Sequence, residues 1–222
     1  MNDDIRFSAG LLDLADASRF LGIPRQTFRR WAVGDGLSAP LLHTVNPDNS
    51  TQARASLITL SEAWVLAALR DAGVRTHRIR PALERLSKDF GREYVLVSRE
   101  LATDGVDVLW DFARTREGEG LIAGGTGQYV MRAIVADYMT YVGWANDGLP
   151  ETLRLRSCEP SKVLIDPYRA FGQPIFAGSQ VRVADAAGMI EAGDKPEVVA
   201  EELGVSIDDV RTATRVLLGR AT

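Results

Sequence analysis

Apolar residues recur at helical spacing in a short stretch near the start of the chain. The apolar positions of this stretch are Leu14, Ala17, Phe20 and Leu21. The pattern predicts an amphipathic helix that begins at Asp13, whose carboxylate is a good N-cap, with Asp16 in the first turn. Gly22 follows at the position where a glycine commonly ends a helix.

A second helix is predicted from about Pro24 to Val33, because proline is tolerated in a first helical turn. Its apolar stripe consists of Ile23, Phe28 and Trp31. The opposite side carries Arg25, Gln26, Arg29 and Arg30. Two short helices joined by a three-residue turn that holds a glycine are typical of a helix-turn-helix.

The next residues predict a wing and two more helices. Strands at Leu41–Val45 and Ala55–Ile58 are expected to form a hairpin around residues 46–50. Thr59 and Glu62 are spaced as a capping box for a helix at about Leu60–Ala72. A further helix is predicted from a cap at Thr76 to about Phe90, with an uncertain start because Pro81 falls in its first turns.

The middle of the chain has a mixed pattern. Short apolar runs at Tyr94–Ser98 and Val106–Trp110 predict two strands, and a glycine-rich loop follows at 117–127. A helix is expected at Gln128–Tyr141. A second strand pair is expected at Thr152–Leu155 and Lys162–Ile165. This segment is therefore interpreted as α+β.

The end of the chain predicts three helices. They are expected at Val183–Ala192, at Pro196–Leu203 after a cap at Asp194, and from a cap at Ser206 and Asp209 to about Leu218. The run Leu203-Gly204-Val205 before this last helix repeats the Leu21-Gly22-Ile23 turn. The predicted fold class is mainly α with short β-hairpins: a winged helix-turn-helix head over 1–92, a linking and dimerising segment over 93–158, and a three-helix domain over 159–222.

Charge separates these segments. The whole chain has a net charge of −4, whereas residues 1–92 carry +3, residues 93–158 carry −4 and residues 159–222 carry −3. A basic region can meet phosphates while an acidic region meets another partner. We therefore expect DNA binding by the head. The candidate residues are Arg25, Gln26, Thr27, Arg29 and Arg30 on the second helix, with Arg75, Arg78 and Arg80 as backbone contacts.

The acidic tail is expected to bind protein and not DNA, because its carboxylates repel phosphates. The candidate residues for partner binding are Glu197, Glu201 and Asp208. Solvated acids on a helical bundle are the structural alternative. For the arginines, the alternative is ordinary solvated surface.

Few residues support catalysis, a metal or a cofactor. The chain has one cysteine, Cys158, and two histidines, so neither a disulfide nor a metal centre is expected. The Gly124-Gly125-Thr126-Gly127 run lacks the lysine of a phosphate-binding loop, so we interpret it as a turn. No apolar run reaches the length of a membrane span. We expect a cytoplasmic protein that is not an enzyme and holds no cofactor.

Two stretches resemble known families. Residues Leu12 to Trp31 resemble the DNA-binding head of MerR-like regulators. Farther on, Gly172, Pro174, Gly178 and Ser179 match the Gly-x-Pro-x-x-x-Gly-[Thr/Ser] turn of a small helical domain that recurs in antitoxins of the VapB kind. Together the two stretches resemble the larger VapB-type antitoxins, although most such antitoxins are short and have a disordered tail.

This resemblance implies a function that the composition does not. It implies a partner toxin that is a PIN-like, metal-dependent ribonuclease, and a homodimer that binds promoter DNA of its own operon. The alternative is a MerR-like regulator that senses a small effector and has no toxin. A metabolic enzyme is a third class, but the sequence offers no set of convergent polar groups for it.

Overall fold

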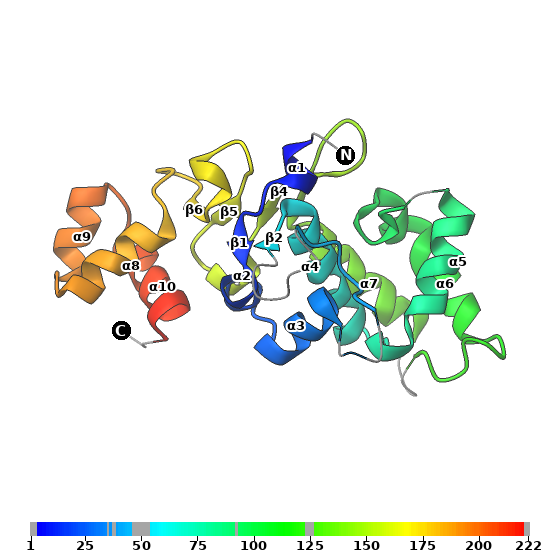
Figure 1. Ribbon diagram of the computed structural model, residues 1–222. Coiled ribbons are helices and arrows are strands. Elements are labelled where there is room, and N and C mark those ends of the chain that lie inside the picture. Colours follow the sequence, from blue (N-terminus) through cyan, green and yellow to red (C-terminus); the bar gives the residue numbers. More distant parts are fainter. Residues whose placement is uncertain are drawn as a thin grey trace. The chain divides into compact units, whose positions relative to one another are not determined.

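The computed structural model describes residues 4–34, 36, 39–45, 54–91, 93–122 and 127–219. The chain divides into two compact units. One consists of Met1–Leu60 with Glu151–Thr222, and we call it the head-and-tail unit. The other, Ser61–Pro150, is the middle unit. Both are built mainly of helices, with short antiparallel strands, which confirms the predicted fold class (Figure 1).

Two helices of the head, over residues 14–21 and 25–33, begin and end close to where the sequence predicts. The Asp13 carboxylate caps α2 by accepting a hydrogen bond from the Asp16 backbone nitrogen at 2.8 Å. A two-residue strand, β1, ends at this cap residue and pairs with β2, with Leu12 opposite Ala55. The elements of the head are α1 (Ile5–Ser8), β1 (Leu12–Asp13), α2 (Leu14–Leu21), α3 (Arg25–Val33), β2 (Arg54–Ala55) and α4 (Leu57–Asp71), which continues into the middle unit.

The tail begins with three antiparallel strands and continues into helices. Leu153 pairs with Ile165, and Val163 pairs with Phe176, so the predicted second strand pair is confirmed and gains a third strand. The predicted helices after Arg182 and Lys195 are confirmed as well. The elements of the tail are β4 (Pro150–Arg154), β5 (Val163–Ile165), β6 (Ile175–Phe176), α8 (Val183–Ala192), α9 (Pro196–Leu203) and α10 (Ile207–Ala213), which ends in a π-helical turn at Thr214–Leu218.

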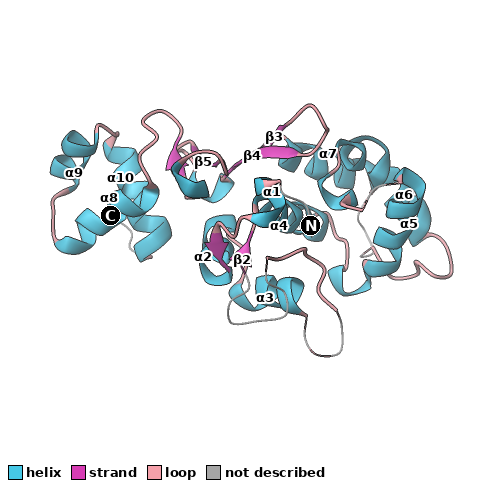
Figure 2. Ribbon diagram, turned by 45° about the horizontal axis from the view of Figure 1, so that its top comes forward, coloured by secondary structure: helices cyan, strands magenta, loops and turns pink. Residues whose placement is uncertain are grey.

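The middle unit packs its helices around buried aromatic and aliphatic side chains. Trp64 donates its indole N–H to the Tyr138 carbonyl at 2.9 Å, and the two rings lie 4.4 Å apart. The Tyr138 hydroxyl in turn donates to Asp71 at 2.6 Å. The elements are a 3₁₀ turn at Thr76–Arg78, α5 (Arg80–Phe90), a 3₁₀ turn at Val95–Val97, α6 (Val106–Ala113), α7 (Gln128–Met139) and β3 (Val142–Trp144) (Figure 2).

The strands predicted at Tyr94–Ser98 and Val106–Trp110 are wrong. Val95–Val97 is a 3₁₀ turn, and a π-helical turn at Leu101–Gly105 leads directly into α6. The buried side chains of α6 are Val106, Leu109 and Phe112, which are spaced three residues apart as on one helical face. Val95–Val97 is wholly apolar and buried, and Val106–Trp110 is apolar except for Asp107. A run this short does not distinguish a strand from a helix.

Two predicted caps are also corrected. The fourth helix begins before Thr59, because Ser56 and Thr59 exchange backbone-to-hydroxyl hydrogen bonds at 3.1 and 3.2 Å. The strand predicted at Ala55–Ile58 is therefore reduced to its first residue. Lys195, not Asp194, stands at the N-cap of α9.

The remaining predictions concern boundaries. Pro81 falls within the first turn of α5, where its missing N–H costs nothing. The compact units divide at Leu60 and Pro150, so they follow borders other than those of the functional segments 1–92, 93–158 and 159–222. That functional division stays a prediction. The glycine run at 124–126 lies outside the described residues.

Candidate nucleic-acid interface and partner surface

The turn between α2 and α3 has the geometry that a helix-turn-helix requires. Gly22 adopts a left-handed conformation with φ of 67°. The following residue, Ile23, donates its backbone N–H to the Ser18 carbonyl at 2.9 Å and so closes the end of α2. Phe28 and Trp31 are 0% and 1% exposed, and they hold α3 against the rest of its unit.

The opposite face of α3 is polar and open. Arg25, Gln26, Arg29 and Arg30 are exposed, and Thr27 is half-buried. Arg25 and Arg29 are four residues apart, as are Gln26 and Arg30, so the four side chains form two adjacent ridges on one helical face. The structure thus brings together the residues of the predicted recognition helix.

The charge on this face is not neutralised from within the described part of the chain. In that part, no carboxylate forms an ion pair with Arg25, Arg29 or Arg30. Arg19 on α2 differs, because it pairs with Asp16 at 2.9 Å. These three exposed arginines lie on one face of α3, so they are available to phosphates and to the edges of bases.

Only the base of the predicted wing is seen in the described residues, because the strand predicted at Leu41–Val45 is reduced to an isolated bridge at Val45. Val45 and Arg54 exchange two backbone hydrogen bonds, at 3.0 and 3.1 Å, as residues on opposite arms of a hairpin do. Residues 46–53, which include the predicted turn, lie outside the described residues. Arg54 is exposed and was not singled out from the sequence, although it falls within the predicted hairpin. Its guanidinium donates to the Gly10 carbonyl at 3.3 Å.

The other predicted DNA contacts belong to the middle unit. Arg75 and Arg78 are exposed, and their guanidinium groups donate to the carbonyls of Gly120 and Glu119 at 3.3 and 2.9 Å. Arg80 is half-buried at the start of α5. Arg75 and Arg78 therefore hold the loop around Glu119 and Gly120 in place, a role that the sequence did not reveal. Their contact with phosphate stays a prediction.

The tail repeats the geometry of the head turn. Gly204 is left-handed, with φ of 63°, and the next residue, Val205, donates its N–H to the Ala200 carbonyl at 3.0 Å. The spacing from donor to acceptor equals that from Ile23 to Ser18. The internal repeat read from the sequence is therefore confirmed as a repeated turn, but α10 carries Ile207 and Asp208 where α3 carries Arg25 and Gln26.

The acidic residues predicted to bind a partner are exposed. Glu197 and Glu201 are four residues apart on α9, and Val198 between them is 47% exposed. Asp208 is exposed and pairs with Arg211 at 3.2 Å on the same helix, and its neighbour Ile207 is 39% exposed. Single exposed apolar side chains are normal on a protein surface, so the role of this face in binding a partner stays a prediction.

Other candidate chemistry is sparse in the described part of the chain. No group of three histidine, cysteine, aspartate or glutamate side chains is placed there to hold a metal ion. Cys158 is buried, and burial raises the pKa of its thiol to about 11, so it is a thiol at neutral pH. None of the helices described is long and apolar enough to cross a membrane.

Comparison with protein families supports the two regions separately. Residues 10–83 match a family described as a "putative DNA-binding HTH domain", which includes the α2–α3 turn and the base of the wing. Residues 163–215 match a family described as "protein of unknown function (DUF433)", which includes β5 to α10. Each match contains one of the two repeated turns, at Gly22 and at Gly204.

Relatives cover nearly the whole chain. A protein of Mycobacterium tuberculosis strain H37Rv named "putative antitoxin VapB45" is 39% identical over 227 residues, which is 95% of each chain. The uncharacterized protein Rv2308 of the same organism is 26% identical over 90% of this chain and 86% of its own. The crystal structure of Rv2018, also from this organism, has a TM-score of 0.74 at 37% identity and covers 94% of this chain and 99% of its own.

Proposed function

This chain belongs to the family of the protein named "putative antitoxin VapB45". We therefore propose that it is the antitoxin of a type II toxin–antitoxin pair. It neutralises a PIN-like ribonuclease toxin and represses its own operon through a MerR-like winged head. No catalytic step is assigned to it. The observation that carries the DNA-binding part is the exposed arginine face of α3 in a helix-turn-helix.

The arginine face accounts for both affinity and sequence reading. Cations that meet phosphates release counterions and supply most of the affinity. A guanidinium also reads a guanine edge with two hydrogen bonds, and a glutamine reads adenine. Arg25, Gln26 and Arg29 lie where a recognition helix faces the major groove.

A homodimer is part of this proposal, because two recognition helices read two inverted half-sites. The surface that supports it is the outer side of α7 in the middle unit. Tyr129 is 89% exposed and Val130 is 55% exposed, and Ala133 and Ala136 follow on the exposed side of the same helix. An apolar strip of this kind is buried when two copies of the helix pack together.

Binding to the promoter of its own operon tests the DNA-binding role. Replacing both Arg29 and Arg30 by alanine removes two cations without touching the core, because both side chains are exposed. We expect the affinity for a promoter fragment to fall by tenfold or more, and the slope of log K against log salt to lose about two units. A gel shift at several salt concentrations measures both quantities.

Arg211→Ala is the matched control for this variant. Arg211 stands seven residues after Gly204, just as Arg29 stands seven residues after Gly22. The Arg211→Ala variant removes a cation from the equivalent place after the tail turn, so its affinity for DNA should equal that of the wild type. Unchanged affinity in the Arg29→Ala/Arg30→Ala protein would reject α3 as the recognition helix.

The toxin is sought among small proteins encoded beside the gene. Expression of such a protein alone should stop growth, and coexpression of this chain should restore it. Charge reversal of Glu197 and Glu201 to lysine is expected to weaken neutralisation, whereas Glu191→Lys, on the exposed side of α8, is the control. If no neighbouring protein is toxic, the antitoxin role fails, and a regulator that senses an effector takes its place.

A further inference from the structure

A short turn of the tail packs against the helix-turn-helix of the head. This turn is the 3₁₀ segment Arg156–Cys158, whose Ser157 hydroxyl donates to the carbonyl of Phe20 near the end of α2. A β-carbon at Gly22, in the turn between α2 and α3, would lie 3.8 Å from Cβ of Ser157. All these residues belong to the head-and-tail unit, so the contact lies within one compact unit.

The 3₁₀ turn is close to the start of the predicted recognition helix. Gly22 stands three residues before Arg25, where α3 begins, and three residues of chain span at most about 11 Å. The major groove of B-DNA is about 12 Å wide, and phosphates line both of its edges. A cation on the 3₁₀ turn is therefore near enough to meet a phosphate at the edge of the groove that α3 enters.

The bases of the tail gather in the segments that contact α2. These contacts come from the 3₁₀ turn and from the π-helical turn at Thr214–Leu218. Residues 151–162 and 210–219, which contain the two turns, together carry five basic and two acidic side chains, whereas residues 183–209 carry one basic and eight acidic. The five bases are Arg154, Arg156, Lys162, Arg211 and Arg215, and the two acids are Glu151 and Glu159. The tail is therefore acidic on its helices and basic where it meets the head.

Arg215 holds the 3₁₀ turn in place and adds positive charge beside it. Its guanidinium donates to the carbonyls of Ser157 and Glu159 at 2.9 and 3.1 Å. In the part of the chain that the structure describes, no carboxylate forms an ion pair with Arg215. Arg156, at the start of the same turn, is exposed to solvent. The turn is thus fixed from within the unit and presents a cation outward.

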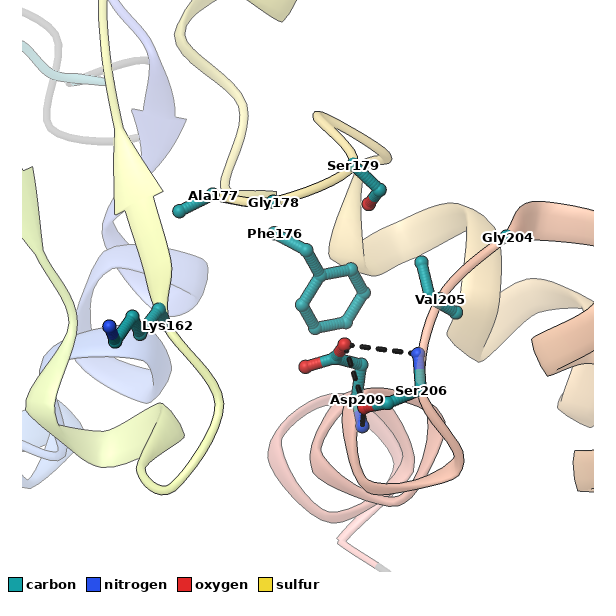
Figure 3. Close-up of a pocket in the computed structure, with 9 residues that line it drawn as sticks. All are labelled: Lys162, Phe176, Ala177, Gly178, Ser179, Gly204, Val205, Ser206 and Asp209. Carbon is teal, nitrogen blue, oxygen red and sulfur yellow. Dashed lines mark hydrogen bonds between the residues drawn. The ribbon is translucent and has the colours of Figure 1, made fainter.

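The acids at the start of α10 are engaged elsewhere. Asp208 pairs with Arg211 at 3.2 Å on the same helix. Asp209 accepts hydrogen bonds from the backbone nitrogen and the hydroxyl of Ser206, at 3.2 and 2.8 Å, in the capping box (Figure 3). Arg211 is therefore neutralised by a neighbour, which distinguishes it from Arg215.

We infer that the tail takes part in DNA binding, and that Arg156 contacts a backbone phosphate at the edge of the groove that α3 enters. The inference rests on the proposed function, which supplies the DNA. A phosphate contact carries no sequence information, but it positions the protein on the duplex. The acidic side of the tail, on α9, stays available to a protein partner.

Arg156→Gln tests this contact, because it removes the cation of an exposed side chain and keeps a polar group. Release of one counterion contributes about fivefold to the binding constant at about 0.15 M salt. We expect the affinity for a promoter fragment to fall about fivefold, and the slope of log K against log salt to lose about one unit. An unrelated duplex of the same length should lose affinity by the same factor. Fluorescence anisotropy at several salt concentrations measures all three quantities.

Lys195→Gln is the matched control for net charge. Lys195 is exposed at the N-cap of α9, within the acidic stretch, so this variant also removes one cation from the surface of the tail. Its affinity and salt slope should equal those of the wild type. Arg156→Lys keeps the charge at the contact and should therefore keep the salt slope.

The outcomes separate this contact from the proposed function. Wild-type affinity and slope in Arg156→Gln overturn the contact and leave the role of α3 intact. So does an equal loss in Lys195→Gln, which is an effect of net charge, or a loss confined to the promoter fragment with an unchanged slope, which is an effect on the position of α3. If the wild type binds the promoter no better than unrelated DNA, operon-specific repression fails, and the slope on unrelated DNA still decides the contact. If it binds no DNA, both proposals fail.

Discussion

Three successive residues, Ala170, Phe171 and Gly172, have left-handed backbones, with φ of 45°, 54° and 72°. For the two residues with a β-carbon this conformation is strained, at a cost of the order of 1 kcal/mol or more each. The surroundings hold it in place, because Gly172 donates its N–H to the Arg169 carbonyl at 2.8 Å and Gln173 donates its side-chain amide to the Leu11 carbonyl at 2.8 Å. The loop therefore presents Phe171 to solvent, at 93% exposure.

The order of stability of two variants at position 171 tests this strain. Glycine at an ordinary exposed position is less stable than alanine, since it loses more backbone entropy on folding. At Phe171 we expect the reverse, with Phe171→Gly more stable than Phe171→Ala by about 1 kcal/mol. That difference corresponds to a melting temperature higher by about 2–4 °C.

Tyr168 supplies the control position for this comparison. Its side chain is 66% exposed, and its φ is not among the positive values. Tyr168→Gly should therefore be the less stable of its own glycine and alanine pair. The same order at both positions would contradict the assignment of strain to Phe171.

At the scale of elements, helix caps separate the correct boundary predictions from the others. Ser206 stands at the N-cap of α10, accepts from the Asp209 nitrogen at 3.0 Å and completes a capping box. Asp194 was predicted to cap α9, yet the chain places Lys195 there without a side-chain bond. The stability that a cap adds depends on the hydrogen bond that it forms, and the residue type alone does not determine it.

We therefore expect Ser206→Ala to lower the free energy of unfolding by about 1 kcal/mol. Asp194→Ala should change it by less than about 0.5 kcal/mol, which is the usual range for a surface substitution. Urea denaturation followed by circular dichroism measures both. An equal loss in the two variants would mean that the side-chain bond of Ser206 contributes little.

Helices with one apolar face and a terminal glycine could be predicted from the sequence. Both α2 and α9 end at the predicted glycine, because only the local backbone decides that boundary. Runs such as Val95–Val97 were assigned wrongly, because a short run that is apolar throughout has no periodicity to separate a strand from a helical turn. The same limit applies to the site. The face of α3 follows from helical spacing, whereas the hydrogen bond from Arg78 to the Glu119 carbonyl joins residues 41 positions apart.

At the scale of the whole molecule, the first 60 residues and the acidic tail belong to one compact unit. The Ser157 hydroxyl donates to the carbonyl of Phe20 on α2. Arg215, after α10, donates to the carbonyls of Ser157 and Glu159 at 2.9 and 3.1 Å. No periodicity in the sequence predicts this arrangement, since the contacts join residues more than 50 positions apart. Residues 1–60 carry six basic and six acidic side chains, so the net charge of +3 over residues 1–92 comes from residues 61–92, in the middle unit. Within the head-and-tail unit, the basic surface is the local arginine face of α3, and the acidic tail is part of the same unit.

One substitution in the tail should therefore loosen the head. A β-carbon at Gly172 would lie 2.4 Å from Cδ2 of Leu11, the residue before β1, and Gly172 also has a left-handed backbone. We expect Gly172→Ala to destabilise the unit by more than about 1 kcal/mol. Since the head shares this packing, amide hydrogen exchange should speed up in β1 and α2 as well as in β6 and α8.

Gly178→Ala is the matched control, because a β-carbon there meets no atom within 4 Å and the backbone is not left-handed. Its exchange rates in α2 should equal those of the wild type. If Gly172→Ala speeds exchange in β6 and α8 but leaves α2 protected, the head and the tail open independently. In that case, binding of a partner to the tail would not affect the arginine face of α3 through this packing. If α2 opens together with the tail, whatever stabilises the tail also stabilises the helix that supports α3, and binding at the two surfaces is thermodynamically linked.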